Sequence, residues 1–153
     1  MELVRQPNND EATGDANVLQ RTHNGGLSKS SSEARHGSFP HEKLDAYHIA
    51  LEMARRAKTL AQKIPRGHRS VADHLLRSSS NAALLLAEGA NRRGKAEKRQ
   101  RFVESRGESG EVAAACDLVI ALELAAETEA LSVKQRAGRV CAMLSGLIDR
   151  ASK

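Results

Sequence analysis

The residues with the clearest chemical potential in this 153-residue chain form a basic segment, residues 92–106. The segment holds two Glu and seven Lys or Arg residues, which are Arg92, Arg93, Lys95, Lys98, Arg99, Arg101 and Arg106. Such a cluster attracts phosphate groups or an acidic protein surface. Phe102 is its only aromatic residue, so nucleic-acid binding would be largely independent of base sequence. The charges would equally suit a solvated helix end with salt bridges such as Glu97 to Arg101, and both interpretations stay open.

Four further polar residues are spaced so that they could meet on two neighbouring helices. Arg77, Asn81 and Glu88 follow one another at steps of four and seven residues, near one stripe of a helix, and Glu111 lies on the next predicted helix. Buried acids and an arginine need partners, so we predict an internal polar network with a structural role. A general acid–base pair is the catalytic alternative, but the sequence supplies no nucleophile to go with it.

The histidines and serines lack the spacing that metal or nucleophile chemistry requires. His68 and His74 are six residues apart and His41 and His48 are seven apart, whereas ligands on one helix lie three or four apart. The serine run at 78–80 has no histidine in register and no Gly-x-Ser-x-Gly turn, which favours a small-residue packing surface. We therefore predict no catalytic residue, no metal and no cofactor, and hence a protein that is not an enzyme.

The elements that must position these residues are predicted to be helices. From Leu44 onward the apolar residues repeat at helical spacing, without the alternation of a half-buried strand, and Pro65 stops the first helix. Capping boxes at Ser70 with Asp73 and at Ser132 with Gln135 predict the starts of the second and fourth helices. Four helices joined by short turns predict an all-α, antiparallel up-down-up-down four-helix bundle.

The third predicted helix, from about Ala96 to Leu124, is the longest and contains two glycines. Each glycine costs a helix about 1 kcal/mol relative to alanine. We therefore expect Gly107 and Gly110 to permit a close helix crossing or to mark a bend.

The apolar stripes of these helices predict the core. The inward residues are Leu44, Tyr47, Leu51, Ala54, Ala57, Ala61 and Ile64 in the first helix, Val71, Leu75, Ser78, Ala82, Leu85 and Gly89 in the second, Phe102, Ser109, Ala113, Cys116, Ile120 and Leu124 in the third, and Val133, Ala137, Val140, Leu144, Leu147 and Ala151 in the fourth. Ile49, Met53, Leu60 and Leu84 lie off these stripes. They predict more apolar surface than one core requires, and hence a homo-oligomer.

Composition limits the class of protein. The chain has 24 Lys and Arg residues against 19 Asp and Glu residues, and it is 40% hydrophobic but only 2% aromatic. This is typical of one globular domain without a base-stacking surface. No apolar run reaches the roughly 18 residues of a membrane span, and no signal-peptide core is present, so we expect a cytoplasmic protein with no membrane partner. Cys116 and Cys141 have no CxxC spacing and are expected to be small buried apolar residues.

Residues 1–40 differ in character from the rest of the chain. They are rich in Asn, Ser and Gly and show no apolar period, which predicts a disordered polar extension. They hold four basic and five acidic residues, so the positive excess belongs to the predicted bundle domain, residues 41–153.

Several short motifs of the bundle domain resemble those of one bacterial family. The stretch 41–54 is similar to the opening helix of the bacterial four-helix bundle family, also known as the 23S rRNA intervening-sequence proteins, which includes the accessory variability determinant of diversity-generating retroelements. Ile64-Pro65 resembles the Leu-Pro stop of that family, and Ala87-Glu88-Gly89 with a downstream Arg resembles its most recognisable run. Phe102 and the stretch 107–111 match its third helix. His41, His74 and Leu85 depart from the aromatic residue, Gln and Asn that are usual there.

The resemblance implies a four-helix bundle that assembles as a homopentamer. In the retroelement branch it implies a nonenzymatic partner of a reverse transcriptase and of RNA. Together with the basic segment, this gives our main hypothesis, a nonenzymatic oligomeric adaptor that binds RNA or DNA, or a nucleic-acid enzyme such as a reverse transcriptase. The alternative is a structural bundle that docks on a protein partner, with the charge serving only solubility.

Overall fold

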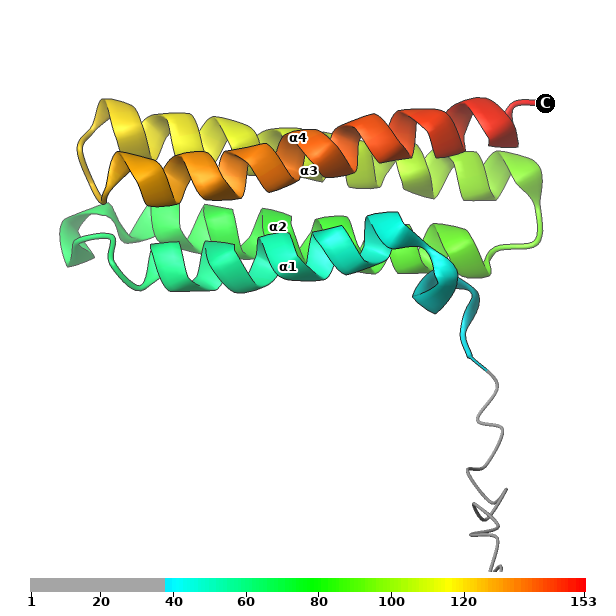
Figure 1. Cartoon of the computed structure of the whole chain (residues 1–153), viewed down its shortest axis with the longest axis horizontal. Coiled ribbons are helices and arrows are strands. Elements are labelled where there is room, and N and C mark those ends of the chain that lie inside the picture. The colour runs from blue at the N-terminus through cyan, green and yellow to red at the C-terminus, as the bar shows by residue number, and fades with distance from the viewer. Residues whose placement is uncertain (1–37) are drawn as a thin grey trace, which may run out of the picture. The chain divides into compact units, whose positions relative to one another are not determined.

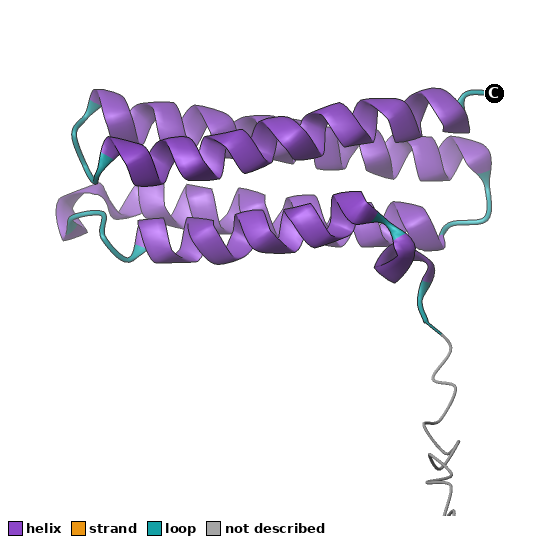
Figure 2. Cartoon of the chain, viewed as in Figure 1, coloured by secondary structure: helices purple, strands orange, loops and turns teal. Residues whose placement is uncertain are grey.

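A computed structural model describes residues 38–153, which form four long α-helices and two short 3₁₀ turns (Figures 1 and 2). The α-helices are α1 (Asp45–Ala61), α2 (Arg69–Asn91), α3 (Lys95–Ala121) and α4 (Glu127–Ala151), and the 3₁₀ turns are η1 (Pro40–Lys43) and η2 (Arg66–His68). The described part contains no strand, and the prediction of an all-α antiparallel four-helix bundle is confirmed. The predicted extension at residues 1–40 lies almost wholly outside the described residues. None of the described helices is long and apolar enough to cross a membrane.

Each helix packs against two neighbours. The backbone of α2 lies close to α1 and α3, and that of α4 lies close to α3 and α1, whereas the backbones of the diagonal pairs are further apart. The α1–α2 and α3–α4 connections therefore lie at one end of the bundle (Figure 1). The α2–α3 connection lies at the other end, together with η1 and the C-terminus. We call this second end the basic end, because the basic segment starts in the α2–α3 connection.

The core is lined by apolar side chains from all four helices. The largest apolar side chains that are fully buried are Met53, Leu60, Leu75, Leu86, Val112, Val119, Val133, Val140 and Leu144. The stripe predicted for the first helix is wrong in part. Met53 and Leu60, predicted to lie off the core, are 0% and 1% exposed, whereas Tyr47 and Leu51 are only partly buried. α1 carries two adjacent apolar stripes, and helical spacing alone does not choose between them.

Neither predicted capping box starts a helix. α2 begins at Arg69 after His68, and α4 begins at Glu127 after Ala126, in both cases without a side-chain cap. Ser132 lies inside α4, where its Oγ accepts a hydrogen bond from Arg56 Nη1 of α1 at 2.8 Å. α4 starts six residues before the position that a cap at Ser132 predicts, and its first turn carries two acids, which the positive end of the helix dipole favours.

The α3–α4 turn holds a non-glycine residue in the left-handed conformation. Glu123 has φ 52°, the only such residue among those described. The amides of Glu123 and Leu124 donate back to Ile120 and Val119, at 3.1 and 2.9 Å, which is the hydrogen-bond pattern of a Schellman motif. The side chain of Leu124 is buried, so this turn closes the core at the end opposite the basic end.

α2 and α3 approach each other closely at Gly89. A Cβ added there would lie 2.8 Å from two ring carbons of Phe102, whose side chain is buried. The close crossing expected at Gly107 and Gly110 is not there, because a Cβ at either position meets nothing within 4 Å. α3 runs unbroken through both glycines.

Candidate functional site

The basic segment covers the α2–α3 connection and the first half of α3. α2 ends at Asn91 because Arg92 adopts an extended backbone (φ −73°, ψ 143°), and α3 restarts at Lys95 after the extended Gly94. The connection is thus three residues long, and it carries Arg92 and Arg93. The remaining five cations follow along α3, from Lys95 at its start to Arg106 near its middle, so the segment runs from the basic end towards the middle of the bundle.

The first two turns of α3 carry cations where helix stability favours anions. Lys95, Lys98 and Arg99 lie there, and Glu97 is the only acid of the first turn. A helix N-terminus bears a partial positive charge, so each nearby cation is unfavourable by about 0.3–1 kcal/mol. Helix stability therefore does not account for this arrangement.

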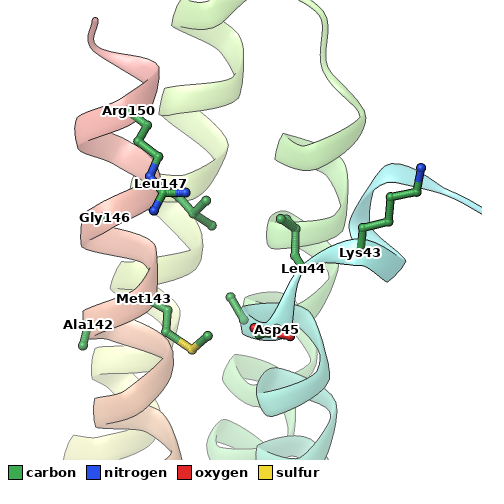
Figure 3. A pocket seen from close by; sticks show the side chains of 9 residues that line it. Lys43, Leu44, Asp45, Ala142, Met143, Gly146, Leu147 and Arg150 are labelled. Atoms are coloured by element: carbon green, nitrogen blue, oxygen red, sulfur yellow. The ribbon is translucent and has the colours of Figure 1, made fainter.

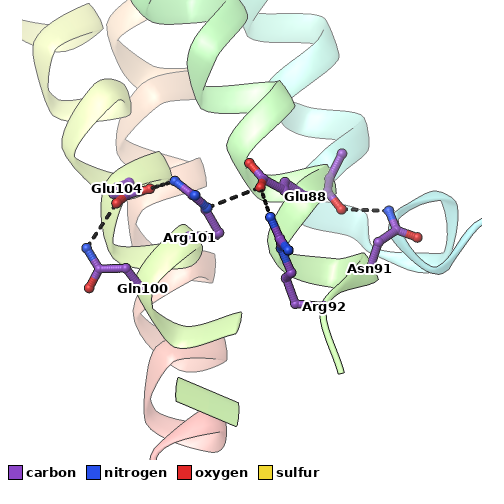
Figure 4. Close-up of polar contacts among 7 residues, drawn as sticks. Glu88, Asn91, Arg92, Gln100, Arg101 and Glu104 are labelled. Carbon is purple, nitrogen blue, oxygen red and sulfur yellow. Dashed lines mark hydrogen bonds and ion pairs between the residues drawn. The ribbon is translucent and has the colours of Figure 1, made fainter. Parts of the chain in front are cut away.

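Carboxylates hold two of the seven cations where α2 meets α3 (Figure 4). Glu88 pairs with Arg92 and also lies 3.3 Å from Arg101 Nε, while Arg101 Nη1 donates to Glu104 Oε2 at 2.6 Å. These carboxylates, Glu104 foremost, raise the pKa of Arg101 above its ordinary value. The Glu97–Arg101 salt bridge considered from the sequence does not form. Glu88 instead links the end of α2 to α3 through its contacts with Arg92 and Arg101.

The five other cations of the basic segment have no carboxylate oxygen within 4.0 Å in the described part of the chain. They are Arg93, Lys95, Lys98, Arg99 and Arg106. Arg99 Nε donates to Ser152 Oγ at 3.0 Å, a neutral partner that leaves its charge uncompensated. Lys98 is half-buried and the other four residues are exposed. This surface therefore offers positive charge that the fold itself does not neutralise.

Two open hollows flank Leu44 and Leu147 at the basic end. The first, of about 410 Å³, lies between the start of α1 and α4, where the two leucine side chains point towards each other (Figure 3). The second, of about 420 Å³, has an apolar floor that includes Ala90 and Phe102. Its charged lining residues are Arg93, Lys95, Lys98 and Arg150, without any carboxylate. We call the second one the cationic hollow.

Sequence reasoning missed Arg150 and the leucines as parts of this site. Arg150 lies on α4, far along the chain from the basic segment, and only the antiparallel packing of the helices brings it to the same end. Leu147 was predicted as a core residue, but it is only partly buried and lines both hollows.

The predicted internal polar network consists of Arg77, Asn81, Glu88 and Glu111, and the structure divides it into three groups along the α2–α3 boundary. Arg77 Nη2 lies 2.8 Å from His74 Nδ1, and His74 Nε2 lies 3.2 Å from Glu111 Oε2. Asn81 donates to Glu108 at 3.2 Å, and Glu88 belongs to the ion pairs above. The side chains of Glu88 and Glu111 are 38% and 53% exposed, so the network is not internal.

Serines fill the interior position that the network was predicted to occupy. The buried polar residues of the described part are Ser78, Ser79, Ser105 and Ser109. Ser105 Oγ donates across the interface to the Ala82 carbonyl at 2.7 Å, and Ser109 Oγ donates to the Ser105 carbonyl at 2.9 Å. Because these short side chains let α2 and α3 approach closely, the longer polar side chains lie at the edges of the interface.

Ser78 and His74 do not form a serine–histidine pair in the structure. Ser78 Oγ donates to Glu111 Oε2 at 3.0 Å, so the carboxylate, and not His74, lies next to the hydroxyl. In a serine–histidine site the imidazole lies beside the hydroxyl and takes its proton. Within residues 38–153, no three His, Cys, Asp or Glu side chains are grouped so that they could hold a metal ion.

A separate ion-pair group joins α1 to α4. Glu52 accepts a hydrogen bond from Arg56 Nη2 at 2.9 Å and lies 3.1 Å from Arg136 Nε, a buried atom that makes ion-pair contact without an aligned hydrogen bond. These guanidinium groups, Arg56 first, hold the pKa of Glu52 below its ordinary value. The i,i+4 spacing of Glu52 and Arg56 was visible in the sequence, but the partner on α4 was not.

Comparison with known proteins agrees with this fold. No curated protein matches the chain. The solved structure of a protein of unknown function from the S23 ribosomal protein family of Bacteroides thetaiotaomicron is similar, with a TM-score of 0.64 and 17% sequence identity over 67% of this chain and 97% of that chain. At this identity the likeness concerns the fold alone. The family model of the 23S rRNA-intervening sequence proteins matches residues 42–146, which include the whole basic segment and part or all of every α-helix. The chain therefore belongs to the 23S rRNA-intervening sequence protein family.

Proposed function

We propose that this protein is a nonenzymatic adaptor whose basic end binds the phosphate backbone of RNA or DNA in the cytoplasm. The observation that carries the proposal is the set of five cations in the basic segment without a carboxylate partner in the described part. Three of them oppose the dipole of α3, so the fold does not need them there. Bound phosphates would compensate the charges that have no carboxylate partner, and they would also offset the repulsion between these cations and the positive end of the α3 dipole.

The expected binding is electrostatic and indifferent to base sequence. Phe102, the aromatic residue of the segment, is 3% exposed and cannot stack on a base. Contacts from Lys and Arg to phosphates give affinity that falls with salt but carry no sequence information. An acidic surface on a nucleic-acid enzyme such as a reverse transcriptase would meet the same cations, and is the protein partner that this proposal admits.

The location of the contact can be tested with two charge-matched triple variants. The first replaces Arg93, Lys95 and Arg99 with Gln, and the control replaces Lys58, Arg66 and Arg139, which have no ion pair within residues 38–153. Anisotropy titration of a labelled single-stranded RNA and a DNA duplex should show a much larger loss of affinity for the first variant. Equal losses would mean that only net charge matters, and would contradict binding at the basic end.

We further propose that the protein acts as a homo-oligomer, with the pentamer that the family resemblance implies. Large apolar side chains that support this are exposed on three helices, with Leu84 of α2 67%, Leu118 of α3 50% and Leu131 of α4 38% accessible. Of the residues first taken as surplus apolar surface, Met53 and Leu60 belong to the core instead. Light scattering at micromolar concentration should give about five times the 16.5 kDa chain mass. A monomer mass would overturn the oligomer, and any other multiple would overturn the pentamer.

A further inference from the structure

We propose that the cationic hollow is a docking site for a short acidic peptide of a partner protein. One large apolar side chain of the peptide occupies the floor, and the carboxylates on either side of it meet the surrounding cations. This goes beyond nucleic-acid binding, because it assigns a second kind of ligand, one that carries an apolar side chain, to a hollow whose cations Arg93, Lys95 and Lys98 phosphates would also meet.

The floor of the hollow is apolar and accessible. Leu44 and Leu147 are partly buried and pack on the core, while Ala90 and Phe102 close the bottom between α2 and α3. The volume of about 420 Å³ lies in the lower part of the range of about 300–1,000 Å³ that is typical of ligand sites. It suits one side chain with its adjoining backbone, not a folded element.

The rim is uniformly cationic although its residues come from three parts of the fold. Arg93 belongs to the α2–α3 connection, Lys95 and Lys98 to α3, and Arg150 to the last turn of α4. None of the four has a carboxylate partner among residues 38–153, and none of the hollow's lining residues is Asp or Glu. Charge complementarity therefore requires an anionic ligand.

The combination of floor and rim favours a peptide over a nucleic acid. A sugar–phosphate backbone has no large apolar side chain to bury, and base stacking needs an exposed aromatic surface, which Phe102 does not provide. An acidic peptide with a Leu or Phe side chain supplies both the carboxylates and the apolar group. Of the basic-segment cations without a carboxylate partner among residues 38–153, Arg99 and Arg106 do not line the hollow, so they stay available to phosphates while a peptide is bound.

The peptide can be tested with two labelled probes of equal charge. One is the hexapeptide Glu-Asp-Leu-Phe-Asp-Glu, and the other replaces its central pair with Gly-Ser. Fluorescence anisotropy with the full chain should show that the first peptide binds at least about tenfold more tightly, because only it can bury apolar area in the hollow. Equal affinity for both peptides, or binding of neither, would overturn the proposal.

Variants of the hollow separate this site from the phosphate-binding surface. Ala151→Trp fills the hollow without removing a charge, so it should weaken the Leu-Phe peptide by about tenfold and leave oligonucleotide affinity unaltered. Leu147→Gln removes part of the apolar floor instead and should have the same two effects on peptide and oligonucleotide affinity.

The cationic rim is tested with two double variants of equal charge. Lys98→Gln with Arg150→Gln should lower the peptide affinity more than Lys98→Gln with Arg139→Gln, because Arg139 lies on α4 away from the hollow.

Each outcome has a distinct meaning once circular dichroism shows that a variant is folded. Unaltered peptide affinity in both Ala151→Trp and Leu147→Gln would overturn the docking site. A change of mass by light scattering in both variants would show that a second copy of this chain occupies the hollow, and would also overturn it. Failure of peptide binding while oligonucleotides still bind overturns this inference alone, whereas the reverse result overturns only the proposed phosphate contact.

Discussion

Gly89→Ala should leave the bundle less stable than the same substitution at a helix position where the added Cβ meets no neighbour. The quantity compared is the free energy of unfolding. A Cβ at Gly89 would lie 2.8 Å from Cδ1 and Cε1 of Phe102 and 3.1 Å from Arg101 Cβ. The ring of Phe102 is 3% exposed, so it cannot move aside without disturbing the core. Gly89 is thus the residue of the Ala87-Glu88-Gly89 motif that lets α2 and α3 approach.

The size of this difference in the free energy of unfolding follows from two opposing effects of the added methyl group. Glycine to alanine in a helix gains about 1 kcal/mol in helix propensity. Overpacking a buried contact costs about 1–3 kcal/mol. The matched control is Gly138→Ala on α4, where an added Cβ meets nothing within 4 Å and only the gain applies. The free energies of unfolding of the two variants should therefore differ by about 1–3 kcal/mol, with Gly138→Ala the more stable.

Urea unfolding followed by circular dichroism measures this difference directly. Phe102→Leu added to Gly89→Ala should make the two changes non-additive, because the smaller side chain removes the ring carbons that the new Cβ meets. Equal stabilisation by Gly89→Ala and Gly138→Ala would refute the close approach of the helices at this position.

Three further predictions rest on other parts of the fold. Glu123→Gly should raise the free energy of unfolding by about 0.5–1 kcal/mol in urea, because φ 52° strains a side-chain-bearing residue, and a loss would contradict the Schellman turn. The pKa of Glu52 is lowered from 4.5 in the folded chain, so its ion pairs stabilise the fold above that pH and the stabilisation fades as the pH falls through the folded value. The difference in unfolding midpoint between the parent and Glu52→Gln should accordingly be present at pH 7 and shrink in acid, and a pH-independent difference would contradict the pairing. Burial raises the pKa of the Cys116 thiol to about 11, so iodoacetamide at pH 8 should label Cys116 more slowly than the half-buried Cys141, with the difference lost in urea; faster labelling of Cys116 by mass spectrometry would contradict its burial.

Helix number and order were predictable because the apolar period persists through the whole domain and Pro65 stops one helix clearly. The positions at which the helices begin and end were less predictable. Ser70 and Ser132 have the right spacing for capping boxes, yet α4 starts at Glu127, where acids in the first turn replace a cap. The spacing rule identifies residues that can cap a helix and does not show that they are needed.

The parts of the candidate site also differ in how well the sequence predicts them. The seven cations of the basic segment are contiguous in sequence, so a local charge count finds them. Which of them are neutralised could not be predicted, because Arg101 pairs with Glu88 across two helices and not with Glu97 in its own turn. Arg150 was not found either, since only the antiparallel packing brings it to the basic end.

The positions of close approach also depend on information that spacing does not contain. Gly107 and Gly110 lower the stability of α3, and no neighbour within the described part of the chain packs against them. At Gly89, in contrast, the ring of Phe102 packs against the helix backbone. In the sequence all three positions have the same pattern, a glycine within a predicted helix. Only the partner across the interface distinguishes them.

The salt dependence of oligonucleotide binding by the full chain tests most directly whether the basic end contacts phosphates. Each phosphate contact to single-stranded RNA contributes about −0.7 to the slope of log affinity against log salt concentration. Contact by the five basic-segment cations of one chain that have no carboxylate partner among residues 38–153 therefore predicts a slope of about −3.5, equal for two RNAs of unrelated sequence. A slope near zero, or an affinity that depends strongly on base sequence, would contradict phosphate binding at the basic end.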